Sequence, residues 1–142
     1  MALDLGDAGS FVAQHRQGVL VTLRRDGRPQ LSNILYLAGA DGTVRVSVTD
    51  SRAKTNNLRR DPRASLHVTS PDFWSFVVLD GTVALSPLAA QPDDAVVGEL
   101  VEMYRLASGE HPDWDEFRQA MVTQGRLVAT LTPTYAYGQL AR

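Results

Sequence analysis

The chain has 142 residues, of which 44% are hydrophobic and 21% charged, as expected for one globular domain. It contains no cysteine, which excludes disulfides, thiolate nucleophiles and zinc-thiolate or iron-sulfur sites. Any redox chemistry must therefore come from a bound cofactor. The formal net charge of -2 is too balanced for a protein whose main partner is a nucleic acid.

Positive charge is concentrated in the first half of the chain. Up to residue 70 there are 10 basic and 6 acidic residues, and beyond it there are 4 and 10. Lys54 is the single lysine among 14 basic residues. No apolar run is long enough to span a membrane, and the first seven residues lack the features of a signal peptide, so a cytoplasmic protein is expected.

Hydrophobic periodicity predicts a short leading helix over residues 7–16. Three strands are predicted after it, at residues 19–23, 30–37 and 44–49. The dipeptides Asp26-Gly27 and Asp41-Gly42 lie between these strands, and Asp-Gly is a strong signal for a tight hairpin turn. The first third of the chain is therefore predicted to form an antiparallel meander.

The period changes at residue 50, where a helix of two to three turns is predicted. Asp50 and Ser51 are its N-cap candidates, and Pro62 ends it. Further helices are predicted over residues 92–107 and 113–124. Further strands are predicted at residues 64–69, 75–79, 82–85, 127–131 and 134–137, with Asp80-Gly81 as a turn.

Six or seven short antiparallel strands with inserted helices indicate a mainly β, α+β domain. A small closed or partly open β-barrel is the architecture that this pattern favours. No linker, repeat or low-complexity segment divides the chain. Residues 1–142 are therefore expected to form a single domain.

Motifs for the commonest chemistries are absent from the sequence. There is no glycine-rich phosphate loop and no GxSxG elbow, and His15, His67 and His111 are scattered without metal-ligand spacing. A Ser-His-Asp triad stays open, because its members need not be neighbours in sequence. No metal site and no catalytic residue are predicted.

The most informative segment is the start of the helix predicted from residue 50. Arg52 and Lys54 lie in its first turn, where the helix dipole makes cations mildly unfavourable. Either Asp50 and Ser51 offset these charges, or a phosphate is bound there by free N–H groups, Ser51, Arg52 and Lys54. The sequence supports these two interpretations about equally. A single lysine among arginines slightly favours the bound phosphate.

Two further groups have both a structural and a functional interpretation. Polar side chains follow one another in the strand Gln30-Leu31-Ser32-Asn33, where they pair with the backbone or with the edge of a heterocycle. Backbone pairing is slightly favoured. Aromatic rings form the second group, for which core packing or a subunit interface is favoured over stacking on a ligand: Phe73, Trp74, Tyr135 and Tyr137.

Together these segments resemble the pyridoxamine 5′-phosphate oxidase-like split β-barrel family, closest to its deazaflavin (coenzyme F420)-dependent oxidoreductases. The most specific part is the run Ser51-Arg52-Ala53-Lys54-Thr55-Asn56-Asn57-Leu58. The resemblance extends over nearly the whole chain, through residues 26–33, 46–48, 51–65, 74–75, 80–81, 109–115, 118–123 and 137–138.

The resemblance implies an FMN-binding-like split barrel and a homodimer with two cofactor sites at the subunit interface. Lys54 and Arg52 would hold the ribityl phosphate, and Ser47 and Val48 would line the same pocket. The other cofactor-binding residues that it implies lie beside the ring system and tail or are weaker matches: Gln30, Ser32, Asn33, Asn57 and Trp74.

The expected function is an F420-dependent reductase that transfers hydride from the reduced deazaflavin to an electron-poor small organic acceptor. The proton would come from solvent or from a tyrosine such as Tyr137. An FMN-dependent oxidoreductase of the same fold and a non-catalytic F420 carrier remain the alternatives. The terminal residues 138–142 contain one basic residue, which disfavours pyridoxamine phosphate oxidation.

Overall fold

The computed structural model describes residues 1–141. Its helices are α1 (Leu5–Ala13), α2 (Ala53–Arg60), α3 (Ala95–Ser108) and α4 (Trp114–Thr123). Its strands are β1 (Gln17–Leu23), β2 (Pro29–Leu35), β3 (Leu37–Ala38), β4 (Val44–Thr49), β5 (Arg63–Thr69), β6 (Phe76–Leu85) and β7 (Arg126–Gln139). Within this part of the chain, no helix is long and apolar enough to cross a membrane.

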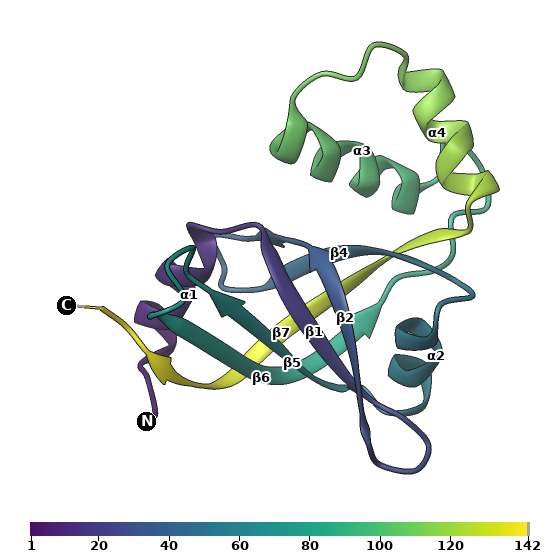
Figure 1. Ribbon diagram of the computed structural model, residues 1–142. Helices are drawn as coiled ribbons and strands as arrows, with labels where there is room; N and C mark the ends of the chain where they lie inside the picture. Colours follow the sequence, from purple (N-terminus) through teal and green to yellow (C-terminus); the bar gives the residue numbers. More distant parts are fainter. Residues whose placement is uncertain (142) are drawn as a thin grey trace.

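All seven strands form one antiparallel sheet in the order β2-β1-β5-β6-β7-β4-β3. The edge strands β2 and β3 are consecutive in the chain and are separated only by Tyr36. Tyr36 is buried, its N–H donates to the Arg16 carbonyl (2.9 Å), and its hydroxyl donates to the Val12 carbonyl (2.7 Å). The sheet therefore curves into the half-barrel of an α+β fold (Figure 1).

The predicted meander is correct for its first hairpin and wrong for its third strand. β1 and β2 pair from Leu23↔Pro29 onward, across a turn in which Gly27 has φ 85°. β4 does not pair with β2, because it lies between β7 and β3. The turn at Gly42, also with φ 85°, therefore joins β4 to the two-residue strand β3.

Asp80-Gly81, which was predicted to be a turn, lies inside the continuous strand β6. The register with β7 shifts between these two residues, which marks a β-bulge. A Cβ atom on Gly81 would lie 2.1 Å from the Thr132 carbonyl oxygen. The glycine therefore serves the close approach of two strands rather than a chain reversal. The two strands predicted at the end of the chain are likewise one strand, β7, which runs through Pro133.

The helices divide between the ends of the barrel and a hairpin beside it. α1 lies at the end that holds both chain termini, α2 lies at the other end, and α3 and α4 project as a helical hairpin (Figure 1). One apolar cluster fills the barrel, and a second joins the hairpin to Leu37, Ala89 and Val128. Arg45 on β4 fastens α3 to the barrel through Glu99 (3.2 Å) and Glu102 (3.3 Å).

Candidate cofactor site

The start of α2 differs from the starts of the other three helices that the structure describes. Asp4, Asp94 and Asp113 cap α1, α3 and α4 by accepting from backbone N–H groups. The N-cap of α2 is Arg52, and no side chain accepts from its first turn. The prediction of Asp50 or Ser51 as the cap is therefore wrong, and Asp50 instead forms an ion pair with Arg59 in the last turn.

α2 is anchored to the barrel by Asn57. Its buried side chain donates to the Thr22 hydroxyl (3.1 Å) and accepts from Arg60 (3.0 Å). Arg60 also donates to the Leu23 carbonyl (2.8 Å). These bonds use the Asn57 amide within the fold and fix the orientation of the helix against β1. They thereby position Lys54, which lies about one turn nearer the start of the helix.

Three cations come together beside the start of α2. Burial of Lys54, and then the charges of Arg52 and Arg126, lower the pKa of the Lys54 ammonium. Among residues 1–141, none of the three forms a salt bridge. Charges that repel one another without an acidic partner favour a bound anion. A phosphate group fits this cluster, because its negative charge would offset the mutual repulsion.

Arg126 is the residue of this cluster that the sequence analysis missed. It opens β7 and lies opposite Thr49, the last residue of β4, just before the turn into α2. It is 72 positions from Lys54 in the chain. Spacing cannot reveal a pairing between strands so far apart, although a basic residue among the four in the acidic half of the chain was a weak signal.

The polar residues of β2 divide between two faces of the sheet. Gln30 and Ser32 pair directly with the buried residues Thr22 and Leu20, so they lie on the side of the barrel interior and α2. Asn33 lies on the opposite face, where it lines an open cavity of about 460 Å³ that His67 also lines. A ligand on one face of β2 therefore meets Gln30 and Ser32, but not the Asn33 side chain.

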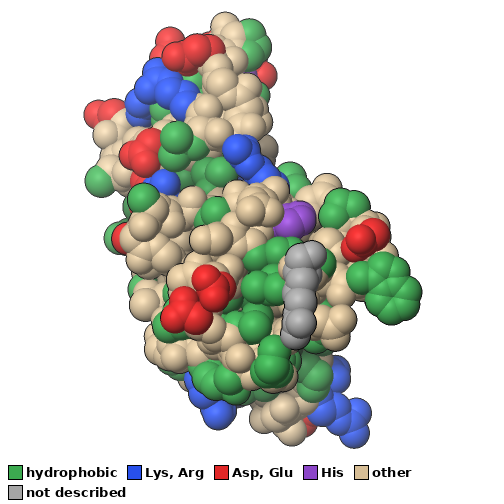
Figure 2. All heavy atoms as spheres, turned by 90° about the vertical axis from the view of Figure 1, so that its left-hand side faces the viewer, with side chains coloured by type: hydrophobic (Ala, Val, Ile, Leu, Met, Phe, Trp, Pro, Cys, Tyr) green, Lys and Arg blue, Asp and Glu red, His purple; other side chains and the backbone are tan. Residues whose placement is uncertain are grey.

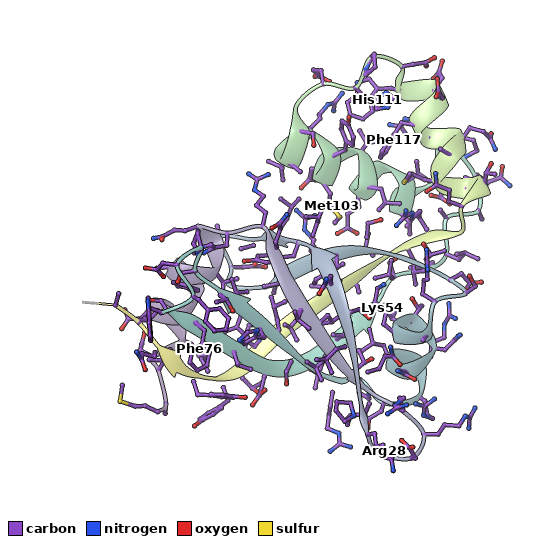
Figure 3. The ribbon with its side chains drawn as sticks, viewed as in Figure 1. Arg28, Lys54, Phe76, Met103, His111 and Phe117 are labelled. Atoms are coloured by element: carbon purple, nitrogen blue, oxygen red, sulfur yellow. The ribbon has the colours of Figure 1, made fainter. Side chains whose placement is uncertain are left out.

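Ser47 and Val48 also point to opposite sides of their strand. Val48 is 1% exposed and belongs to the apolar cluster inside the barrel, so only its backbone is available to a ligand. Ser47 faces the helical hairpin and lines a cavity of about 390 Å³ together with Arg126. Figure 3 shows Lys54 between the barrel and α2, and Met103 on the side of α3 that faces the barrel.

The aromatic candidates lie away from this cluster within one chain. Trp74 is 75% exposed in the loop between β5 and β6, at the end of the barrel opposite α2 (Figure 1). Tyr137 lies eleven residues after Arg126 along β7, a separation of up to roughly 36 Å for an extended strand. Either ring would reach the cations only from a second copy of the chain.

With these positions established, comparison with known proteins identifies the family. A family profile described as pyridoxamine 5′-phosphate oxidase matches residues 7–139. The chain belongs to this family. Its seven-stranded half-barrel with four helices is the fold of that class, whose members include oxidoreductases.

Solved structures with this fold have diverse descriptions. A conserved hypothetical protein from Mycobacterium tuberculosis is 23% identical, with a TM-score of 0.72 over 96% of this chain and 84% of that one. An F420 reductase is 22% identical, with a TM-score of 0.64 over 90% and 94%. A heme storage protein from Vibrio cholerae is 15% identical, with a TM-score of 0.67 over 95% and 94%. At these identities the similarity establishes the fold alone.

Proposed function

We propose that this protein is an F420-dependent oxidoreductase that reduces an electron-poor small organic acceptor. The observation that carries the proposal is the cluster of Arg52, Lys54 and Arg126 at the uncapped start of α2. F420 contains a phosphate that such a cluster would hold. The resemblance of the run from Ser51 to Leu58 to the F420-dependent branch, and the similarity to an F420 reductase, support the choice of cofactor.

In this proposal the chain binds and orients, while the cofactor supplies the redox chemistry. A reduced deazaflavin supplies a hydride, that is, two electrons and one hydrogen nucleus, and a proton from solvent completes the reduction of the acceptor. Arg52, Lys54 and Arg126 would hold the phosphate, and Ser47, which lines a cavity together with Arg126, would lie next to it. Gln30 and Ser32, on the other side of the sheet, are the proposed neighbours of the ring system and tail. Holding both reactants in place removes much of the entropic barrier to their encounter.

We further propose that the working form is a homodimer with a cofactor site at each end of the interface. The outer face of the sheet exposes large apolar side chains, such as Leu31 (59% exposed) and Tyr135 (49% exposed). Figure 2 views the end of the barrel that holds α1 and both termini, where apolar side chains lie among polar ones, and shows charged groups on the projecting hairpin. A second copy would cover the outer face of the sheet and would bring Trp74 or Tyr137 toward its partner's cations.

The carrier alternative is tested by turnover. The enzyme is expected to oxidise many equivalents of reduced F420 per chain, and only when an unsaturated acceptor such as an activated enone is present. Oxidation that stops at one equivalent would favour the carrier. The FMN alternative predicts a yellow protein on purification, whereas the F420 proposal predicts no flavin absorbance without added cofactor.

A further inference from the structure

The cavity beneath the α3–α4 hairpin has apolar walls and positively charged surroundings. Its volume of about 390 Å³ lies within the range of small-molecule sites. The walls come from the outer side of the barrel and from both helices of the hairpin: Leu37, Leu100, Met103, Tyr104, Phe117 and Met121. Methionine side chains adapt to ligands of different shape, so these walls suit an apolar body.

The charged residues around this cavity are all basic. Arg16, Arg45 and Arg126 line it, and no acidic residue does so within residues 1–141. Arg45 is neutralised by Glu99 and Glu102. Arg16 donates only to the Ala107 carbonyl (3.0 Å) and has no acidic partner among the described residues.

The guanidinium groups of Arg16 and Arg126, which have no acidic partner among the described residues, come from opposite sides of β4. Arg126 belongs to β7, which pairs with one edge of β4. The backbone of Arg16 is bonded to Tyr36, next to β3, which pairs with the other edge. Ser47 lies on β4 between them and lines the cavity. The cavity therefore begins at the proposed phosphate cluster and ends at a second, separate cation.

We propose that this cavity binds an amphipathic organic anion, with its apolar body beneath the hairpin and its anionic group on Arg16. The further assignment of this anion as the hydride acceptor rests on the proposed function, because Ser47 and Arg126 place the cavity next to the cofactor site. The proposal that the cavity binds an anion does not rest on the proposed function.

The test compares two fluorescent probes on the full chain without cofactor. The anionic probe is 8-anilino-1-naphthalenesulfonate, and the neutral probe is N-phenyl-1-naphthylamine, which has the same aromatic skeleton without the sulfonate. Arg16→Gln is expected to weaken binding of the sulfonate about tenfold, the size of one charge-assisted hydrogen bond, and to leave the neutral probe unchanged. Arg28→Gln, at the exposed tip of the β1–β2 hairpin, is the charge-matched control and should change neither.

A second pair of variants tests the location. Ala107 lines the cavity but is exposed, so Ala107→Trp should fill its mouth without disturbing the core and weaken both probes at least about tenfold. Leu106→Trp, its exposed neighbour outside the cavity lining, should weaken neither. Circular dichroism confirms that each variant is folded. Equal sulfonate affinity in Arg16→Gln and the parent, or unchanged binding of both probes to Ala107→Trp, would overturn the proposal.

The assignment as acceptor site has its own readout. The sulfonate should inhibit F420H2 oxidation competitively with the acceptor and should bind together with F420, whereas competition with F420 would refute the assignment. If F420 does not bind but the probe pattern holds, the proposed function fails and the anion cavity stands. If turnover occurs without the probe pattern, the cavity proposal fails alone.

Discussion

Lys54 is the residue whose energetics most clearly reflect a missing counter-charge. Burial, Arg52 and Arg126 lower its pKa, so the unfolded chain holds this proton more tightly than the folded chain does. The penalty to folding is absent above the unfolded pKa of about 10.4, appears as the pH falls through it, and is complete below the folded pKa. At pH 7 the ligand-free protein therefore bears this penalty, and a bound anion offsets it.

A first prediction follows for Lys54→Met, which keeps the side chain's bulk and removes its charge. Without ligand at pH 7, the variant should melt roughly 1–3 °C above the parent. Inorganic phosphate should raise the Tm of the parent at least twice as much as that of the variant, as measured by differential scanning fluorimetry. An equal phosphate effect on both proteins would remove Lys54 from the anion site.

Arg126 gives a second prediction at the same scale. Arg126→Gln should weaken F420 binding about tenfold, because one charge-assisted hydrogen bond to the phosphate is lost, and should raise the pKa of Lys54 by removing a neighbouring positive charge. Isothermal titration calorimetry gives the affinity. Arg28→Gln serves again as control, and an equal loss in both variants would show that only net charge matters.

The site residues differ in how far sequence could place them. The alternation of a β-strand already separates Gln30 and Ser32 from Asn33, and Ser47 from Val48, so these divisions were accessible from period-two geometry alone. The involvement of Arg126 was not, because it depends on β4 pairing with β7, and three helices and two strands lie between them in the chain. The hydrogen bond from Asn57 to Thr22 could not be predicted either, since the two residues are 35 positions apart in the chain.

At the level of elements, the strands were easier to locate than to connect. Asp26-Gly27 and Asp41-Gly42 are turns with left-handed glycines, whereas Asp80-Gly81 lies within β6. The same dipeptide serves two purposes: glycine permits positive φ in a turn, and it permits the backbones of β6 and β7 to approach closely at a bulge. The sequence pattern does not show whether an Asp-Gly pair forms a turn or a bulge.

Two glycine substitutions test this distinction. Gly81→Ala should lower the free energy of unfolding by at least about 2 kcal/mol, because its Cβ would collide with the Thr132 carbonyl. Gly98→Ala, in the interior of α3 where a Cβ meets nothing within 4 Å, should stabilise the protein by up to about 1 kcal/mol. Urea denaturation measures both, and a neutral Gly81→Ala would contradict the close-packing account.

On the scale of the whole molecule, the sheet has an apolar outer face that a monomer would leave in water. Leu31→Glu on this face should shift the protein from dimer to monomer in light scattering and weaken F420 binding, because the proposed site includes both copies. Leu106→Glu, on the hairpin and similarly exposed at 57%, should leave the mass unchanged. A monomeric parent protein would contradict the proposed interface.

The central claim is that the cations at the start of α2 hold the phosphate of a deazaflavin. Isothermal titration calorimetry of the purified protein with F420 and, in parallel, with FMN tests it most directly. The account predicts one F420 bound per chain, with FMN binding substantially more weakly. Tight FMN binding with no response to F420 would contradict it.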